Sequence, residues 1–225
     1  MSRSSLPVML TGASGGIGIA ISEKLRQSGY EVLAPTSQEL NLNCQNSVSN
    51  WLDKHAEISL QGLILAAGVN YPENLFGTET DRFEEIQQIN FLANRKLLSV
   101  FVPRMVEQNF GRIVSISSAY SNLARSGRAS YSISKAGLDA LMRSIALEFG
   151  RNNVLANSVV PGFVDTPLTR KNNSQSQIEH ILTRIPIGRL GTPDEIAKAT
   201  MFLLSSENTY VTGQRIYVDG GFSIN

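Results

Sequence analysis

The chain has 225 residues, 42% of them hydrophobic and 17% charged, which is the composition of a globular protein rather than a disordered or fibrous one. Twenty basic and nineteen acidic residues leave a net charge of +1 with no basic tract, so a nucleic-acid-binding surface is not expected. No apolar run reaches the ~18 residues of a membrane-spanning helix, and the polar N-terminal segment 1–7 does not resemble a signal peptide. The single cysteine, Cys44, excludes an internal disulfide and fits a reducing compartment, while His55 and His180 lack metal-ligand spacing. These features predict a cytoplasmic protein with residues 1–225 in one domain.

Short apolar runs alternate with longer amphipathic stretches along the whole chain. The predicted strands are 8–10, 31–34, 63–66, 112–117, 155–160 and 215–218, and the predicted helices are 17–28, 48–54, 81–106, 134–149 and 193–204. Several strands lack polar alternation, as is typical of parallel strands buried on both faces. The pattern predicts an α/β fold: one doubly wound parallel sheet with helices on both faces. The polar stretch 169–177 is expected to be an exposed loop.

Start signals are clearest for the last helix. Thr192 can cap it, Pro193 suits its first position, and Asp194 and Glu195 complement the positive helix end.

The connection after the second predicted strand is unusually short. Only the five residues 35–39 precede the apolar pair Leu40 and Leu42. A helical crossover between parallel strands needs about a dozen residues or more. The sequence therefore predicts that the helix between the second and third strands is missing and that the sheet edge there is trimmed.

A glycine-rich turn follows the first predicted strand and opens the first helix, in the sequence T-G-A-S-G-G-I-G from Thr11 to Gly18. Glycines let the backbone approach a pyrophosphate closely, and the helix N-terminus supplies free N–H groups and a partial positive charge. A tight structural turn would look similar, but the strand–turn–helix context favours nucleotide binding.

The same turn resembles the T-G-x-x-x-G-x-G cofactor turn of the short-chain dehydrogenase/reductase family. The segment Tyr131 to Lys135 fits that family's Y-x-x-x-K motif, with Ser118 thirteen residues upstream of the tyrosine. The resemblance continues in P-G-F-V-D-T from Pro161 to Thr166, in G-R-L-G-T-P-D-E at 188–195 and in V-D-G-G at 218–221. It is strongest to the bacterial 3-oxoacyl-[acyl-carrier-protein] reductases within the family. A Rossmann-type fold and hydride transfer between a nicotinamide cofactor and a ketone or secondary alcohol are what the resemblance implies.

Elementary chemistry leads to the same catalytic residues. Reducing a ketone needs a hydride donor on one face of the carbonyl and an acid at its oxygen, and a free tyrosine with a pKa of ~10 is a poor acid–base group at neutral pH. A lysine four residues later on a helix lies on the same face, so Lys135 can lower the pKa of Tyr131. Ser118, at the end of a strand, can hold the carbonyl oxygen. The family implies that Lys135 also bonds the nicotinamide ribose and that Asn90 supports a proton relay through water.

Each of these residues has a structural alternative. An isolated Y-x-x-x-K is usually a helix-surface pair, and Ser117 competes with Ser118. A mid-helix asparagine such as Asn90 often bonds a nearby backbone group. Thr166 resembles the threonine that meets the nicotinamide amide, but it also suits a helix cap.

The resemblance places a cofactor along a defined set of residues. They are Gly12, Ser14, Gly15, Gly16, Ile17, Gly18, Thr36, Ser37, Asn41, Ala67, Gly68, Tyr131, Lys135, Pro161, Gly162, Val164 and Thr166. Ala67 and Gly68 stand in a run, L-A-A-G, where the family often has N-N-A-G, so the asparagine that braces the sheet is missing. Asn41 replaces the usual aspartate at the adenine.

Cofactor choice depends on the residues after the second strand. An NAD enzyme normally has an acid at the end of that strand, but the sequence is Pro35, Thr36 and Ser37, with no acid before Glu39. Thr36 and Ser37 can donate hydrogen bonds to a 2′-phosphate. The basic residue common in NADP-binding glycine turns is Gly15 in this chain. NADP is favoured, and NAD is not excluded.

The substrate is less well defined. The best expectation is a 3-oxoacyl thioester, yet the two surface arginines that dock carrier protein in the family correspond to Asn109 and Asn152, with Arg112 and Arg151 nearby as replacements. A sugar, polyol or specialised-metabolite dehydrogenase is the alternative, and a catalytically silent nucleotide-binding protein is a rival of another class. The region 168–185 is expected to cover the substrate. The family also implies a homotetramer, or at least a dimer, through helices 81–106 and 134–149, and the sequence predicts neither a nucleic acid nor a membrane as partner.

Overall fold

The computed structural model describes residues 6–73 and 80–225, and its centre is a parallel sheet. The strands are β1 (Val8–Thr11), β2 (Val32–Leu33), β3 (Gly62–Leu65), β4 (Gly111–Ile116), β5 (Val154–Pro161) and β6 (Arg215–Val218). They pair in the order β2-β1-β3-β4-β5-β6, every pair parallel. The predicted α/β sheet is therefore confirmed.

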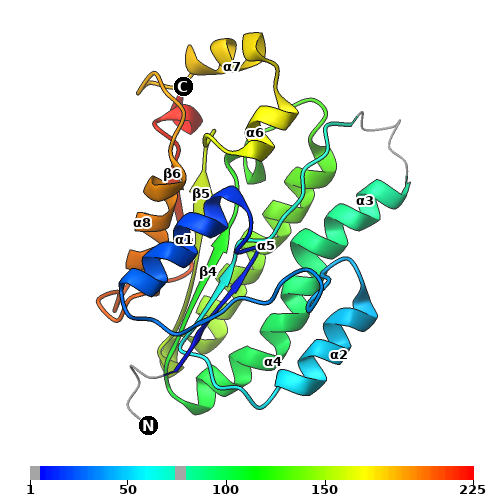
Figure 1. The fold of residues 1–225 in the computed structure, drawn as a ribbon. Helices are drawn as coiled ribbons and strands as arrows, with labels where there is room; N and C mark the ends of the chain where they lie inside the picture. Colours follow the sequence, from blue (N-terminus) through cyan, green and yellow to red (C-terminus); the bar gives the residue numbers. More distant parts are fainter. Residues whose placement is uncertain (1–5, 74–79) are drawn as a thin grey trace.

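Helices cover both faces of the sheet (Figure 1). One layer contains α1 (Gly16–Gln27) and α8 (Pro193–Leu204), and the other contains α2 (Gln45–His55), α4 (Ala93–Glu107) and α5 (Ala129–Phe149). Three shorter helices, α3 (Thr80–Gln87), α6 (Pro167–Asn172) and α7 (Gln175–Leu182), lie at the periphery. Within the part of the chain that the structure describes, no helix is long and apolar enough to cross a membrane.

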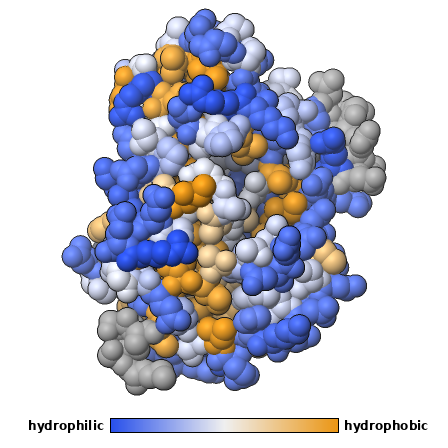
Figure 2. Space-filling view, viewed as in Figure 1, coloured by the Kyte–Doolittle hydropathy of each residue, from blue (hydrophilic) through white to orange (hydrophobic). Residues whose placement is uncertain are grey.

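The first strand shows why the two layers form. Val8 and Leu10 pack into the cluster that contains Ile21 of α1, whereas Met9 between them packs with Leu97 of α4 on the opposite face. Successive strand side chains point to opposite faces, so a strand that is apolar throughout needs a helical layer on each side. Figure 2 shows a mainly hydrophilic outer surface, with apolar residues gathered toward the middle of this view.

The sheet edge is trimmed, as predicted, but the predicted absence of a helix between the second and third strands was wrong, because α2 connects β2 to β3. After the two-residue strand β2, the chain turns at Thr36, whose carbonyl accepts from the Leu40 amide, and it enters α2 from Cys44 without an intervening helix. Leu40 and Leu42 form no strand; Leu40 is buried in the core beneath this edge, and Leu42 packs beside it. The outermost position of the sheet on this side thus belongs to β2.

Two expectations about local structure were wrong. The predicted loop 169–177 forms most of α6 and the beginning of α7, because Thr166 caps α6 ahead of Pro167 and Ser174 forms a capping box with Gln177. The predicted helix 81–106 is not a single α-helix, since a π-helical segment, Gln88–Leu92, separates α3 from α4. The start signals of α8 are confirmed, with a capping box between Thr192 and Glu195.

Candidate active site

Two adjoining hollows open at the carboxyl ends of the central strands, where ligands bind in open parallel sheets. We call the first the inner cavity, which is bordered by Ser118, Tyr131, Lys135, Gly162 and Thr166 among others. The second, the outer groove, runs along the glycine turn past Thr36 and Asn41. Ala66 and Gly68 border both, so the two hollows are continuous.

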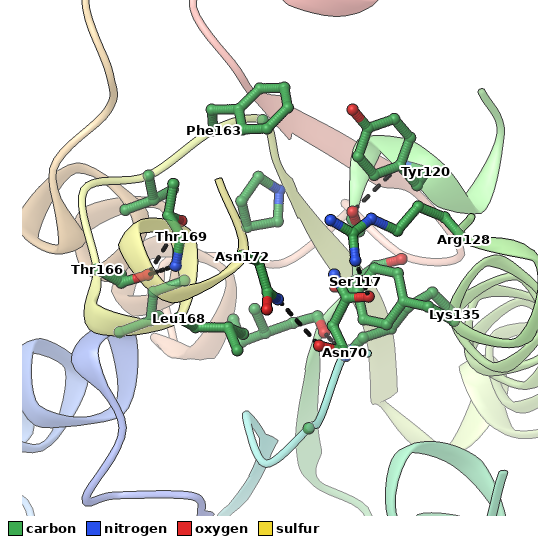
Figure 3. Close-up of a pocket in the computed structure, with 18 of the residues that line it drawn as sticks. Asn70, Ser117, Tyr120, Arg128, Lys135, Phe163, Thr166, Leu168, Thr169 and Asn172 are labelled. Carbon is green, nitrogen blue, oxygen red and sulfur yellow. Dashed lines mark hydrogen bonds between the residues drawn. The ribbon is translucent and has the colours of Figure 1, made fainter. Parts of the chain in front are cut away.

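The structure brings Ser118, Tyr131 and Lys135 together on the wall of the inner cavity. Ser118 follows β4, and its hydroxyl oxygen accepts from the Tyr120 amide at 3.2 Å. Tyr131 and Lys135 occupy the first turns of α5, which begins at Ala129 and not at residue 134 as predicted. The Lys135 ammonium lies 5.8 Å from the centre of the Tyr131 ring. Figure 3 shows Lys135 beside Ser117, opposite Thr166 and Leu168.

Lys135 is 4% exposed, and its Nζ donates to the Ile116 carbonyl at 2.7 Å. Burial lowers the pKa of Lys135 to about 8, while the Asp139 carboxylate one turn later on α5 opposes that shift. Asp139 is itself buried, and neither of its oxygens has a hydrogen-bond partner in the described part of the chain. Lys135 is therefore a cation whose charge depends on pH just above neutrality.

Several neighbours shift the pKa of the Tyr131 phenol. Burial raises its pKa, whereas a hydrogen bond with Ser118 and the positive charge of Arg128 lower it. Ser117, the competing serine, also borders the cavity, but its hydroxyl has no hydrogen-bond partner among the described residues and does not shift the pKa of the phenol. The geometry therefore favours Ser118 over Ser117 as the hydroxyl that acts with Tyr131.

Asn90 lies outside both hollows, in the π-helical segment, and is fully buried. Its Oδ1 accepts from the Val69 amide at 2.8 Å, and its Nδ2 donates to the Val69 carbonyl and to Ser134 Oγ, each at 3.0 Å. The side chain thus joins the loop after β3 to α5 directly behind Lys135. The backbone-bonding alternative is observed, and a role in a proton relay stays a prediction. Segments of π-helix are frequent at functional sites.

The glycine turn is built for close approach. Gly12 has φ +72°, and a Cβ there would lie 2.6 Å from the Ala67 backbone. A Cβ on Gly18 would lie 2.0 Å from the Gly12 carbonyl oxygen, and one on Gly16 would lie 2.9 Å from Thr166 Cγ2. No side chain caps α1, and its first turn contains no acid. Its free N–H groups therefore suit a pyrophosphate, so these residues fit a dinucleotide.

The other predicted cofactor residues divide between the two hollows. The outer groove is bordered by Gly12, Ser14, Gly15, Thr36, Ser37, Asn41, Ala67 and Gly68, and the inner cavity by Ile17, Gly68, Tyr131, Lys135, Pro161, Gly162, Val164 and Thr166. Gly16 and Gly18 border neither hollow, but a Cβ on either would collide with its neighbours in the turn or at Thr166. Thr166 both borders the cavity and caps α6 by accepting from the Thr169 amide.

Two predicted polar residues of the groove already have internal partners. Thr36 donates from its amide and its hydroxyl to the Glu39 carboxylate, at 2.8 and 2.9 Å. Asn41 Oδ1 accepts from the Asn43 amide at 3.0 Å. A carbonyl oxygen has two lone pairs, so Asn41 retains capacity for an adenine amino group.

Several bordering residues were missed by the sequence reasoning. Arg26 on α1 borders the outer groove and donates to Ser22 Oγ at 2.6 Å. Arg125 and Arg128, in the segment before α5, border the inner cavity with Asn70 and Asn172. Arg128 stands three residues before Tyr131, a spacing that places both at one helix start. Leu168, Thr169 and Asn173 also border the cavity, as expected for the region 168–185.

This arrangement can protonate and deprotonate an oxygen. A phenol, a neighbouring hydroxyl and a buried ammonium converge on one cavity, which opens into a groove suited to a dinucleotide. A ketone in the cavity could accept a proton from Tyr131 while Ser118 holds its oxygen. Among the described residues no cluster of metal-binding side chains occurs.

Comparison with known proteins agrees with this chemistry. The model of the family described as enoyl-(acyl carrier protein) reductase matches residues 39–223. The 3-oxoacyl-[acyl-carrier-protein] reductase FabG of Rickettsia felis is 32% identical over 231 residues, with 95% of each chain covered. The solved structure of 4-hydroxyisoleucine dehydrogenase complexed with NADH superposes with a TM-score of 0.91 at 25% identity, covering 98% of this chain and 100% of that one. The aldohexose dehydrogenase of Thermoplasma acidophilum superposes with a TM-score of 0.88 at 28% identity, covering 99% and 96%. A match over most of the chain, together with the glycine turn and the Ser118, Tyr131 and Lys135 cluster, shows that this chain belongs to the short-chain dehydrogenase/reductase family of nicotinamide-dependent oxidoreductases.

Proposed function

We propose that this chain uses NADP(H) to interconvert a ketone and a secondary alcohol, with Ser118, Tyr131 and Lys135 as catalytic residues. The convergence of these three side chains on one cavity, continuous with the dinucleotide groove, carries the proposal. The nicotinamide supplies the hydride in reduction and accepts it in oxidation. The protein supplies the proton and the position of the reacting oxygen.

Each catalytic residue has a distinct task. Tyr131 donates its phenolic proton to the carbonyl oxygen in reduction and takes it back in oxidation. The hydrogen bond from Ser118 lowers the pKa of Tyr131, which stabilises the phenolate that forms. Lys135 adds positive charge behind the ring, and Asn90 fixes the loop at Val69 against α5. These contacts hold the acid at one place relative to the bound carbonyl.

The outer groove supports NADP over NAD. Arg26 is the one cation that borders this groove among the described residues, and its guanidinium donates to Ser22 Oγ. Gly15 lacks the charge that many NADP-binding turns carry, and Arg26 supplies a charge from the next turns of α1 instead. A guanidinium is well suited to a 2′-phosphate.

Replacing Arg26 with alanine is expected to weaken NADPH binding about 10- to 100-fold, because a hydrogen-bonded charge is lost at the phosphate. NADH lacks that phosphate and serves as the internal control. Nucleotide fluorescence titrations of the wild type and the variant with both cofactors make the measurement. Equal weakening of NADPH and NADH, or tighter binding of NADH by the wild type, would contradict the assignment.

A 3-oxoacyl thioester is the first substrate class to test, since the FabG relatives carry that activity in their name. The suggested replacement of the docking arginines by Arg112 is wrong, because Arg112 is 2% exposed and its guanidinium donates to the Gly111 and Asn153 carbonyls. Arg151 remains exposed.

A second class, a polar small metabolite such as a sugar or polyol, is favoured by the cavity wall. Asn70, Thr169, Asn172 and Asn173 give it a polar lining, and the aldohexose dehydrogenase shares the fold. NADPH oxidation assayed with a neutral acetoacetyl thioester and with polar ketones separates the two classes. Turnover of no ketone or alcohol with either cofactor would contradict the proposed function.

The rate of ketone reduction is expected to fall as the pH rises through about 8, the pKa of Lys135. The ammonium is present below that pH and stabilises the phenolate, and its loss above that pH removes the stabilisation. The Asp139 carboxylate favours the charged lysine, so Asp139→Asn should move the alkaline limb of the kcat/KM profile to lower pH. Asp53→Asn, an exposed change on α2, should leave the profile where it is. An unmoved limb in Asp139→Asn would exclude this coupling.

We also propose a cytoplasmic homotetramer or homodimer. Ile133 and Leu147 on α5 and Leu92 at the start of α4 are exposed apolar side chains at 52%, 87% and 42%. They lie on the two elements that the family resemblance assigns to subunit contacts. A monomer by light scattering would overturn the proposal.

A further inference from the structure

The inner cavity contains a buried arginine that has no anionic partner among the described residues. Arg128, the residue before α5, is only 5% exposed and borders the cavity near Tyr131. Its guanidinium donates to one neutral oxygen, Asn70 Oδ1, at 3.1 Å. Figure 3 shows this side chain reaching into the cavity between Tyr120 and Asn70. Taking a charge out of water without an opposite charge is costly, so buried arginines are usually paired.

No described residue supplies the missing charge. No aspartate or glutamate borders the inner cavity, and none of the ion pairs formed within the described chain includes Arg128. Glu73 lies in the loop beside this segment, but its carboxylate accepts from Ser130 Oγ and is not within ion-pair distance of Arg128.

A second arginine adds to the positive charge. Arg125 also borders the cavity, stacks over the rings of Tyr120 and Phe163 at 5.6 Å from each centre, and donates to the Tyr120 hydroxyl. Burial lowers the pKa of Arg128, and the like charge of Arg125 lowers it further. With Lys135, the cavity holds three cationic side chains and no acid among its described lining. The Tyr131 phenolate and the cofactor account for the lysine, but they leave the arginines uncompensated.

Neutral amides hold this part of the cavity in place. The Asn70 side chain accepts from Arg128, while the Asn70 carbonyl accepts from Asn172 Nδ2 at 2.9 Å. Asn172 belongs to α6, so the loop after β3, the start of α5 and α6 are joined around the guanidinium. The arginine is therefore positioned by groups that leave its charge unpaired, which is the pattern of a binding residue.

We infer that the inner cavity binds a substrate that carries a free carboxylate, which Arg128 holds while the ketone lies against Tyr131 and Ser118. The inference rests on the proposed ketone reduction and names the substrate class within it: an oxo acid or hydroxy acid. The planar guanidinium matches a carboxylate with two parallel hydrogen bonds. A neutral thioester has no group that compensates the arginine, so the free acid is the better substrate.

The test uses three compounds that share one acetoacetyl group: acetoacetate, its ethyl ester and its N-acetylcysteamine thioester. Only the first has a negative charge beside the ketone. Levulinate and its ethyl ester repeat the comparison with the carboxylate one carbon farther from the ketone. NADPH oxidation by the full-length protein gives kcat and KM for each compound.

The wild type is expected to prefer each acid to its ester about tenfold or more in kcat/KM. Arg128→Gln should lower kcat/KM for the acids about 10- to 100-fold, mainly by raising KM, and should leave the neutral compounds within a few-fold. Arg128→Lys keeps the charge without the planar fork and should lose less, again only with the acids. Arg143→Gln removes the same charge from the exposed face of α5 and serves as the matched control. Thermal melts verify that each variant is folded.

Equal use of acids and esters by the wild type, or an equal loss for acids and neutral compounds in both Arg128 variants, would overturn the inference. If the wild type reduces none of the ketones, calorimetric titration with acetoacetate and levulinate in the presence of NADP⁺ decides. Binding that Arg128→Gln weakens would support the carboxylate site and contradict the proposed reduction. Binding that does not depend on Arg128, or no binding, would reject the site.

Discussion

Tyr131→Phe is expected to lower kcat for ketone reduction about 10³-fold, because the variant retains the ring and loses the only proton donor assigned to the carbonyl oxygen. Affinity for the nucleotide should change by no more than a few-fold, since the ring still borders the cavity and Lys135 retains its bond to the Ile116 carbonyl. Steady-state kinetics and a fluorescence titration of the same preparation measure the two quantities. A selective loss of turnover would identify the phenol as the acid.

Tyr210→Phe is the matched control, because Tyr210 is 96% exposed and does not border the inner cavity. It should leave kcat and nucleotide affinity unchanged. Unchanged turnover in Tyr131→Phe would show that another group protonates the substrate. A wild type that binds nucleotide and turns over no ketone or alcohol would favour the catalytically silent nucleotide-binding protein, the rival that shares this fold.

Gly18→Ala is expected to displace the glycine turn and to weaken nucleotide binding tenfold or more. The added Cβ would lie 2.0 Å from the Gly12 carbonyl oxygen, 2.8 Å from the Gly12 carbonyl carbon and 3.0 Å from Ala13 Cα. All three are backbone atoms, so no side chain can rotate away to make room. Overpacking of this kind costs about 1–3 kcal/mol, which lowers the Tm of a chain of this size by roughly 2–12 °C.

Gly150→Ala provides the comparison, since a Cβ there would meet no atom within 4 Å and its φ of −59° suits alanine. Calorimetric melting should give an unchanged or slightly higher Tm for this variant, and the nucleotide affinity should match the wild type. If Gly18→Ala binds the nucleotide as tightly as the wild type, the close approach between Gly12 and Gly18 is not needed for the site.

The regular part of the fold was predictable because parallel strands leave a strong local signal. The strand 215–218 matches β6, and the run 63–66 differs from β3 by one residue at each end. Of the two, β3 is apolar and buried along its whole length, so it needs cover on two faces. The helix starts at Thr192 and at the glycine turn were predictable for the same reason, since capping and glycine chemistry act within a few residues.

The errors arose where local signals were weak or were not used. Thr166 with Pro167, and Ser174 with Gln177, are local helix starts that were read as parts of a loop because the stretch is polar. The error at the π-helical segment has a different cause, because this segment is held by contacts with distant residues. Asn90 bonds Val69 and Ser134, residues 21 and 44 positions away, and the site of such contacts cannot be read from the helical period.

The sequence by itself determined the doubly wound sheet, the trimmed edge and the glycine turn, and it identified Ser118, Tyr131 and Lys135 as the residues that share one cavity. The sheet, the trimmed edge and the glycine turn follow from local spacing and the hydrophobic pattern, whereas the three catalytic candidates were identified with the help of the family resemblance. Only the tertiary structure decided that Arg112 is unavailable for docking, that Arg26 borders the outer groove and that Arg128 lies buried without an ion pair to any described residue. An arginine looks the same in the sequence whether it is solvated or enclosed. Its burial and its partners depend on segments that only the folded chain brings together.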